Sequence, residues 1–247
     1  MQPVGGMDGI AHAFARELEG LIQFNARVVD IHQDDSGVRA TFEDTGEPGS
    51  RHGATADWCV CTIPLSILGQ IPMNVGTPMN QAINAVPYAS AVTVGLQFKR
   101  RFWEEDEHIY GGISYPIHGC HGGGKGVLLG GYVWGPEAMK FTSMSPAERV
   151  REAVAQGRQI HPQYDAEFEN GVSVAWHRSP FTMGCFGLWT DASREKHYDN
   201  LCAFDGRIVL AGEHAPFLPT WQEGAVTSAH DAIGRLHQRA LTGSRAA

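Results

Sequence analysis

Hydrophobic and polar side chains near the start of the chain follow a pattern that predicts a helix and then a β-hairpin. Apolar residues recur at helical spacing in residues 9–22 and share one face: Ile10, Phe14, Leu18 and Leu21. Residues 26–33 and 37–44 then alternate between apolar and polar side chains, as half-buried strands do. The Asp-Asp-Ser-Gly sequence between them is a turn signal, so we expect the two strands to pair as a hairpin.

Apolar runs further along the chain predict five more strands, at residues 56–64, 90–99, 126–135, 171–177 and 206–212. The first of these ends at a proline, after which we expect a short helical turn. Ser145, Pro146 and Glu148 form a helix start signal for the segment 145–160. Residues 223–241 predict a closing helix. Since strands cluster in the middle with helices between them, the predicted fold class is α/β in an α+β composite arrangement.

Composition and charge narrow the class of partner. The 247 residues are 43% hydrophobic, enough for a sizeable core in one large domain or two small ones. The formal net charge of −8 argues against nucleic acid or an anionic membrane as the main partner. No apolar run approaches the roughly 20 residues of a membrane span, and no charged-then-apolar leader opens the chain. We therefore expect a cytoplasmic location.

The cysteines do not form a metal or disulfide framework in sequence. Their number is odd and their positions lack paired metal spacing: Cys59, Cys61, Cys120, Cys185 and Cys202. Cys59 and Cys61 are one residue apart on a predicted strand, so their side chains point the same way. We interpret them as buried thiols of a protein from a reducing compartment.

The glycine-rich sequence at residues 118–126 has two readings. A phosphate cradle would need a preceding strand, a following helix and a Ser or Thr after the lysine, whereas Lys125 is followed by Gly126 and a strand. A flexible hairpin loop fits better. His118, Cys120 and His121 could bind metal, but their spacing fits no common zinc pattern. No metal site is predicted.

The segment 206–233 is where ligand chemistry is expected. An apolar strand ends at Gly212, a loop with prolines follows, and a helix begins at about Gln222 to Ala225. A glycine lets the backbone approach a ligand, and a helix N-terminus offers N–H groups and a partial positive charge to an anionic or electron-rich group. An ordinary strand–loop–helix connection would show the same pattern, so the residues alone leave both readings open.

The sequence IVLAGEH…TWQEGAVTSAHDA in this segment resembles the flavin-dependent amine oxidases, the family of monoamine, L-amino acid and polyamine oxidases. Four further stretches resemble that family in the same order: VGGMDGIAHAFARELEG, ARVVDI, DWCVCTIPLSIL and FKRRFW. The match is collinear from about residue 4 to residue 236. The resemblance implies FAD as cofactor, with the backbone of Val28 beside the adenine and Pro64 near the flavin. It also implies Glu213 near the ribityl or pyrophosphate group.

The resemblance further implies that the chain corresponds to the C-terminal half of a family member. Family members begin with a strand, a Gly-rich turn and a helix that bind the FAD pyrophosphate, but no G-x-G-x-x-G occurs in the 247 residues. We expect a second polypeptide to supply that turn. By analogy, residues 1–72 form the adenine side of the FAD domain, residues 73–175 belong to the substrate domain, and residues 176–247 form the flavin end.

The motif PFTMGCF at residues 180–186 resembles the version in monoamine oxidases, where a cysteine is joined by a thioether to the 8α-methyl of FAD. Trp176 lies nine residues before Cys185, as the flavin-flanking Trp of the family does. Cys185 is therefore a candidate for covalent attachment of FAD, with Gly184 giving the ring edge access. The alternative is a small residue that packs against the ring with its thiol unmodified.

Phe186 and Trp221 match the two aromatic cage residues that face each other in front of the flavin and orient an amine. The family usually carries a lysine ten residues before its Phe-Trp landmark, where this chain has Thr93 before Trp103. A positive charge there helps reduced flavin react with oxygen, so the resemblance leaves an oxidase and a dehydrogenase open.

Together these features imply oxidation of the C–N bond of an amine or amino acid by hydride transfer to flavin N5. The N-terminus of the closing helix, at Gln222, Glu223, Gly224 and Ala225, would stabilise negative charge on the flavin. Two other classes stay open. A flavoprotein of the same fold could be a desaturase or dehydrogenase acting on C–C bonds, and a non-catalytic subunit could only assemble with a partner.

Overall fold

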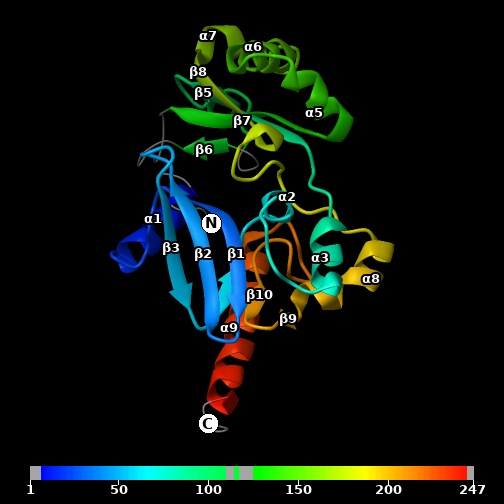
Figure 1. The fold of residues 1–247 in the computed structure, drawn as a ribbon. Coiled ribbons are helices and arrows are strands. Elements are labelled where there is room, and N and C mark those ends of the chain that lie inside the picture. Colours follow the sequence, from blue (N-terminus) through cyan, green and yellow to red (C-terminus); the bar gives the residue numbers. More distant parts are fainter. Residues whose placement is uncertain (1–6, 110–113, 117–124, 244–247) are drawn as a thin grey trace. The chain divides into compact units, whose positions relative to one another are not determined.

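A computed structural model of the chain describes residues 7–109, 114–116 and 125–243. The chain divides into two compact units (Figure 1). The first contains Met1–Gln23 and Ser90–Trp176, and the second contains Phe24–Ala89 and His177–Ala247. Both mix helices with sheet, as the sequence predicts. The breaks at 89/90 and 176/177 and the grouping of residues 1–23 with the middle of the chain differ from the expected divisions at 72/73 and 175/176.

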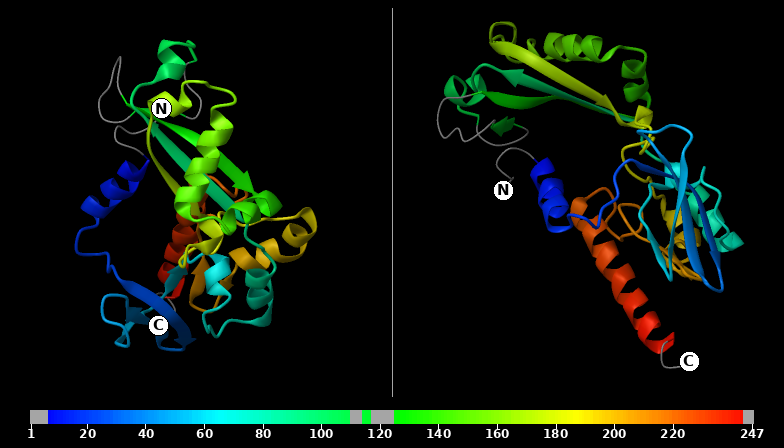
Figure 2. Two further views of the ribbon diagram at one scale, coloured as in Figure 1. Left: turned by 90° about the horizontal axis from the view of Figure 1, so that it is seen from above. Right: turned by 60° about the vertical axis from the view of Figure 1, so that its left-hand side comes forward.

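The first unit is built on a four-stranded antiparallel sheet with the order β6-β7-β5-β8. The strands are β5 (Ala91–Phe98), β6 (Ser114–Pro116), β7 (Gly126–Trp134) and β8 (Phe168–Ala175). The helices of this unit are α1 (Asp8–Glu17), α4 (Phe102–Glu105), α5 (Gly135–Thr142), α6 (Pro146–Gly157) and α7 (Tyr164–Glu167). Helices α5 and α6 run along one face of the sheet (Figure 2). A buried cluster that includes Val92, Leu96, Phe98 and Phe102 forms the core.

The second unit contains two three-stranded sheets. One is an antiparallel meander of β1 (Ala26–Asp34), β2 (Gly37–Asp44) and β3 (Arg51–Ala56). The other has the order β4-β10-β9, in which β4 (Cys59–Cys61) pairs in parallel with β10 (Ile208–Leu210), and β9 (Phe204–Asp205) pairs antiparallel with β10. Every residue of β10 is buried, as expected for a central strand covered on both faces.

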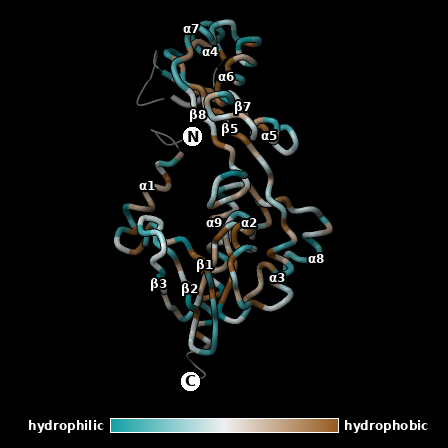
Figure 3. Tube along the Cα trace, turned by 45° about the horizontal axis from the view of Figure 1, so that its top comes forward, coloured by the Kyte–Doolittle hydropathy of each residue, from teal (hydrophilic) through white to brown (hydrophobic). Residues whose placement is uncertain are grey.

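The helices of the second unit are α2 (Leu65–Leu68), α3 (Thr77–Asn84), α8 (Asp191–Cys202) and α9 (Gln222–Gly243), and a short 3-10 helix, η1 (Trp176–Arg178), spans the boundary between the units. Leu65, Met79, Ile83 and Leu201 join the strand residues in the main core cluster. Figure 3 shows the contrast between the hydrophobic strand β5 and the hydrophilic helix α8.

Elements with strong periodicity lie close to where the sequence predicts them. The hairpin of β1 and β2 is confirmed, and so is the start of α6, where Ser145 and Glu148 form the expected capping box. Helix α1 is shorter than predicted and ends at Glu17. Its large apolar residues Ile10 and Phe14 are exposed. The hypotheses of a flexible loop and of metal binding at residues 118–126 fall mostly outside the described residues.

No helix in the described ranges of the chain is long and apolar enough to cross a lipid bilayer. The thiol of Cys61 is buried, as the sequence predicts, whereas that of Cys59 is only partly buried. Burial raises the pKa of the Cys61 thiol to about 11, so this cysteine is a packed core residue and a poor nucleophile.

Candidate functional site

The junction between β10 and α9 is built around Gly212. This residue has φ of 116°, a left-handed conformation that favours glycine. Its backbone N–H donates to the hydroxyl of Ser228 at 2.9 Å, so the end of the strand is fixed to the second turn of α9. The helix begins at Gln222, as predicted, and includes Glu223, Gly224 and Ala225 in its first turn. A side chain at Gly224 would overlap the carbonyl oxygen of Leu218, so the preceding loop packs directly on the helix start.

Glu213 follows this glycine and contacts two separate backbone segments. Its carboxylate accepts hydrogen bonds from the backbone N–H of Thr220 at 3.0 Å and from that of Gly187 at 3.2 Å and 3.3 Å to its two oxygens. Burial raises the pKa of Glu213, and the two amide hydrogen bonds act in the opposite direction. Thr220 has φ of 75°, which is rare for a β-branched residue.

The segment that carries Cys185 and Phe186 is held along residues 87–89. Backbone hydrogen bonds join Cys185 N to Ala89 O at 2.9 Å, Ala89 N to Phe186 O at 2.9 Å, and Leu188 N to Pro87 O at 2.7 Å. This short antiparallel ladder fixes the side-chain directions of both predicted site residues. Phe186 is buried, with 7% of its surface exposed, whereas Trp221 is 65% exposed.

The structure gives a reason for glycine at position 184 other than the predicted access of a flavin ring to Cys185. A Cβ atom at this position would overlap the side chain of Tyr88, so the glycine allows residues 184–187 to lie against Tyr88. Met183, just before it, has φ of 45°. The glycine is therefore required by the packing of the chain itself, whether or not it also gives access to a flavin ring.

The partly buried Tyr88 and the buried His214 form a side-chain pair next to this segment. The hydroxyl of Tyr88 accepts a hydrogen bond from Leu65 N at 3.1 Å and lies 3.3 Å from Nδ1 of His214. If the hydroxyl donates to Nδ1, the proton of the neutral imidazole is on Nε2. Nε2 is buried and has no hydrogen-bond partner among the described residues. Burial lowers the pKa of His214 to about 4, so the ring is neutral at pH 7.

Val28 and Pro64, both predicted to contact the cofactor, line one cavity of about 360 Å³. Val28 lies on β1 beside a bulge in its pairing with β2, and Pro64 is the residue before α2. The other lining residues are mostly apolar and include Ile63, Ile67 and Phe181. An apolar cavity of this size suits a flat aromatic ring. The sequence predicts Pro64 near the flavin and Val28 near the adenine, whereas the structure gives them a common cavity.

The remaining two predicted residues, Thr93 and Trp176, lie in the first unit and contact each other. The indole Nε1 of Trp176 donates a hydrogen bond to Oγ1 of Thr93 at 2.9 Å. Thr93 is in the middle of β5, and Trp176 directly follows β8, which pairs with β5. The hydroxyl of Thr93 is thus engaged by the tryptophan.

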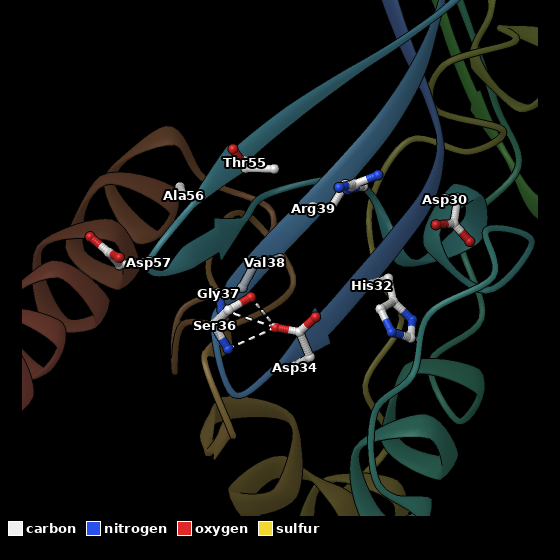
Figure 4. A pocket seen from close by; sticks show the side chains of 10 residues that line it. All are labelled: Asp30, His32, Asp34, Ser36, Gly37, Val38, Arg39, Thr55, Ala56 and Asp57. Atoms are coloured by element: carbon white, nitrogen blue, oxygen red, sulfur yellow. Dashed lines mark hydrogen bonds between the residues drawn. The ribbon is translucent and has the colours of Figure 1, made fainter.

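A polar hollow of about 620 Å³ lies on the meander sheet (Figure 4). Asp30, His32 and Asp34 face it from β1, and Arg39 faces it from β2. None of the predicted site residues lines it, and no group of three or more metal-ligating side chains suited to a metal ion occurs in the described ranges. We therefore place the candidate site at the β10–α9 junction.

Sequence reasoning missed Tyr88, Gly187, His214, Thr220 and Ser228. His214 directly follows the Ala-Gly-Glu motif, and its place in a buried segment was the only signal for it. The other four residues contribute a backbone amide, a positive φ or a long-range hydrogen bond. None of these features can be recognised from the types of residue in the sequence.

Comparison with known proteins identifies the class. Residues 1–235 match the model of the flavin containing amine oxidoreductase family, and the chain belongs to this family. The chain is 30% identical to the putative L-amino-acid oxidase YobN of Bacillus subtilis over 241 residues, which cover 91% of the chain and 50% of the relative. It is 28% identical to the flavin-dependent L-tryptophan oxidase RebO of Lentzea aerocolonigenes, covering 93% of the chain and 51% of the relative.

The fold agrees with this membership. Cyclohexylamine oxidase from Brevibacterium oxydans matches 95% of the chain and 53% of its own length, with a TM-score of 0.75 and 17% sequence identity. The chain thus spans about half the length of the relatives it matches. The cofactor that the family implies is FAD. The apolar cavity at Val28 and Pro64 and the buried, unpartnered Nε2 of His214 are compatible with a group of this kind.

Proposed function

We propose that the chain forms the flavin-side half of an FAD-dependent oxidoreductase that oxidises the C–N bond of an amine or an L-amino acid. When bound, FAD would accept a hydride from the carbon next to nitrogen, after which the imine hydrolyses to a carbonyl compound. The observation that carries the proposal is the junction at Gly212. The strand end, the start of α9 and the segments of Phe186 and Trp221 are joined there by the hydrogen bonds of Gly212 and Glu213.

The residues of the chain have distinct proposed roles. Phe186 and Trp221 would confine and orient the amine, which supplies proximity rather than acid–base chemistry. The backbone of Val28 would lie beside the adenine and Pro64 would lie near the flavin, and both residues line one mostly apolar cavity. The first turn of α9, from Gln222 to Ala225, would stabilise negative charge on the flavin ring.

Cys185 and Thr93 concern two further properties, the covalent attachment of FAD and the choice of electron acceptor. We propose a thioether between Cys185 and FAD, with the backbone ladder of residues 185–188 fixing the position of the thiol. Thr93 replaces the family's lysine and is bonded to Trp176, so no positive charge of its own is offered to the reaction of reduced flavin with oxygen. An electron acceptor other than oxygen is therefore included in the proposal.

A second polypeptide is proposed to supply the Gly-rich turn that holds the FAD pyrophosphate. The 247 residues contain no G-x-G-x-x-G, so the turn would have to come from residues outside them. Exposed apolar side chains are available for such an interface, including Phe14 on α1 and Phe217 beside α9.

The test is to isolate the chain with whatever co-purifies and record its flavin spectrum. We expect one FAD per complex, and bleaching of the flavin band when cyclohexylamine or an L-amino acid is added without oxygen. A colourless complex would contradict the proposal and favour a non-catalytic subunit. If the chain expressed alone were monomeric and retained one FAD per chain, the second polypeptide would be excluded.

A further inference from the structure

Glu213 joins the two chain segments that carry the aromatic residues of the proposed cage. Gly187, whose N–H donates to the carboxylate, directly follows Phe186. Thr220, whose N–H donates to the same carboxylate at 3.0 Å, directly precedes Trp221. One side chain therefore fixes the backbone beside both aromatic residues, although these are 35 positions apart in sequence, from 186 to 221.

The hydrogen bond from Thr220 to Glu213 involves a residue with an unusual backbone conformation. A φ of 75° is strained for a β-branched residue and persists only where the surroundings hold it. The amide of Thr220 is the group that Glu213 binds, so the carboxylate stabilises the conformation in which the chain enters Trp221 and α9. Without the carboxylate, the backbone of Thr220, which leads directly into Trp221, would lose this restraint.

The second segment is anchored from the same side chain. Phe186 is already held by its carbonyl, which accepts from Ala89 N at 2.9 Å. The amide of the next residue, Gly187, points to Glu213. The segments that carry Phe186 and Trp221 are therefore linked to each other through Glu213.

The environment of the carboxylate agrees with a structural contact to backbone. Both of its hydrogen-bond donors in the described part of the chain are main-chain amides, and no arginine or lysine pairs with it there. Burial raises the pKa of Glu213, so a carboxylate in this place is retained at a cost to folding.

We propose that Glu213 is a positioning residue that ties the Phe186 and Trp221 segments together and sets the geometry of the cage. This goes beyond the role as a cofactor contact that the family resemblance implies. The inference rests on the proposed function for the identity of the cage, whereas the tie between the two segments is a contact within this chain.

Hydrogen exchange measured by mass spectrometry on the purified chain, with whatever co-purifies, tests the tie. In Glu213→Ala we expect amides in residues 185–189 and in residues 219–224 to exchange at least about tenfold faster, because both lose the same acceptor. Exchange in β4 and β10 should stay unchanged. Glu195→Ala, which removes an exposed glutamate of α8, is the matched control and should change neither segment.

Glu213→Gln provides a second variant of the same shape. Its amide leaves one acceptor oxygen for the two backbone N–H groups of Gly187 and Thr220, which then share it, so a smaller acceleration of about threefold at both segments is expected. If Glu213→Ala fails to fold, the same exchange measurement is made on Glu213→Gln. FAD content is measured in each sample.

Faster exchange in both segments supports the tie. Acceleration in one segment alone would overturn it, and so would unchanged exchange with loss of FAD, because Glu213 would then be a cofactor contact only. Failure of the proposed function would show separately, as wild-type protein without flavin or without bleaching by an amine, and the exchange comparison can be made in either case.

Discussion

The indole of Trp176 donates a 2.9 Å hydrogen bond to the hydroxyl of Thr93, and so joins the residue after β8 to the middle of β5. The sequence resemblance predicts that Thr93 stands where the family usually has a lysine. The hydroxyl therefore has a defined partner inside the protein, and its replacement can be tested both for stability and for the reaction with oxygen.

Thr93→Val should lower the free energy of unfolding by about 1 kcal/mol, because the valine has the same shape but cannot accept the hydrogen bond. Urea denaturation of the isolated complex measures the difference. Thr93→Ser keeps the hydroxyl and serves as the control. Equal stability of Thr93→Val and wild type would mean that the Trp176 contact contributes nothing.

Thr93→Lys should speed the reaction of reduced flavin with oxygen by about tenfold or more, since a positive charge stabilises the superoxide that forms first. Stopped-flow mixing of the reduced complex with oxygenated buffer measures this rate. Thr93→Met, a long neutral side chain, separates the effect of charge from that of size. An unchanged rate in the lysine variant would show that charge at this position does not control oxygen reactivity.

Trp221→Ala should reduce kcat/KM by about 10- to 100-fold while leaving FAD content nearly unchanged, because the cage residue orients substrate and does not hold the cofactor. Trp221 is 65% exposed, so little folding free energy is lost with its ring. Flavin absorbance and steady-state kinetics on the same samples give both values. If flavin and activity fell together, Trp221 would belong to the cofactor contacts.

Denaturing electrophoresis should leave yellow fluorescence on this chain if Cys185 carries FAD, and Cys185→Ala should release all of it. The backbone of Cys185 is held by Ala89 O at 2.9 Å, so the thiol has a fixed place in the chain. Cys202→Ala is the matched control and should stay fluorescent. Colourless denatured protein with FAD in the supernatant would show that Cys185 is unmodified.

His214 should make the folded state less stable below about pH 6.5. Its pKa is lowered to about 4 by burial, so between pH 6.5 and 4 the unfolded chain binds more protons than the folded one. The free energy of unfolding therefore falls as the pH falls, by about 2 kcal/mol at pH 5 from this group alone. Urea unfolding at pH 7 and pH 5 measures the loss.

His214→Asn cannot titrate and retains a hydrogen-bonding group near Tyr88, so its loss of stability over the same pH interval should be smaller by about that amount. His32→Asn, at an exposed histidine of β1, should behave as wild type. An identical pH dependence in wild type and His214→Asn would contradict the assignment.

The sequence predicts elements whose burial follows a regular pattern. Strand β5 alternates or stays apolar along its length, and α6 begins with a complete capping signal, so both lie where expected. Strand β3 was missed because all six of its residues are exposed, which leaves no apolar alternation. Helix α8 was missed because it is polar nearly all round and buries only Leu201.

The backbone connections at the candidate site were not predictable from the sequence. Family resemblance points to Phe186, Glu213 and Trp221, which the structure brings to one junction through backbone amides. A hydrogen bond from a carboxylate to the amide of Gly187 has no residue-type signature, because every residue except proline has that amide. The positive φ of Thr220 is likewise invisible in sequence, since threonine rarely adopts it.

The parallel pairing of β4 with β10 has a consequence for the order in which the protein forms during translation. Ile208 pairs with Cys59, and residues 90–176 of the other unit lie between these strands in sequence. The ribosome must therefore complete the intervening segment, whose own core runs from Val92 to Ala175, before β4 can find its partner. Closing so long a loop is slow, and meanwhile the edge of β4 is exposed. The nascent chain is thus most open to aggregation or chaperone binding in the interval before residue 208 emerges.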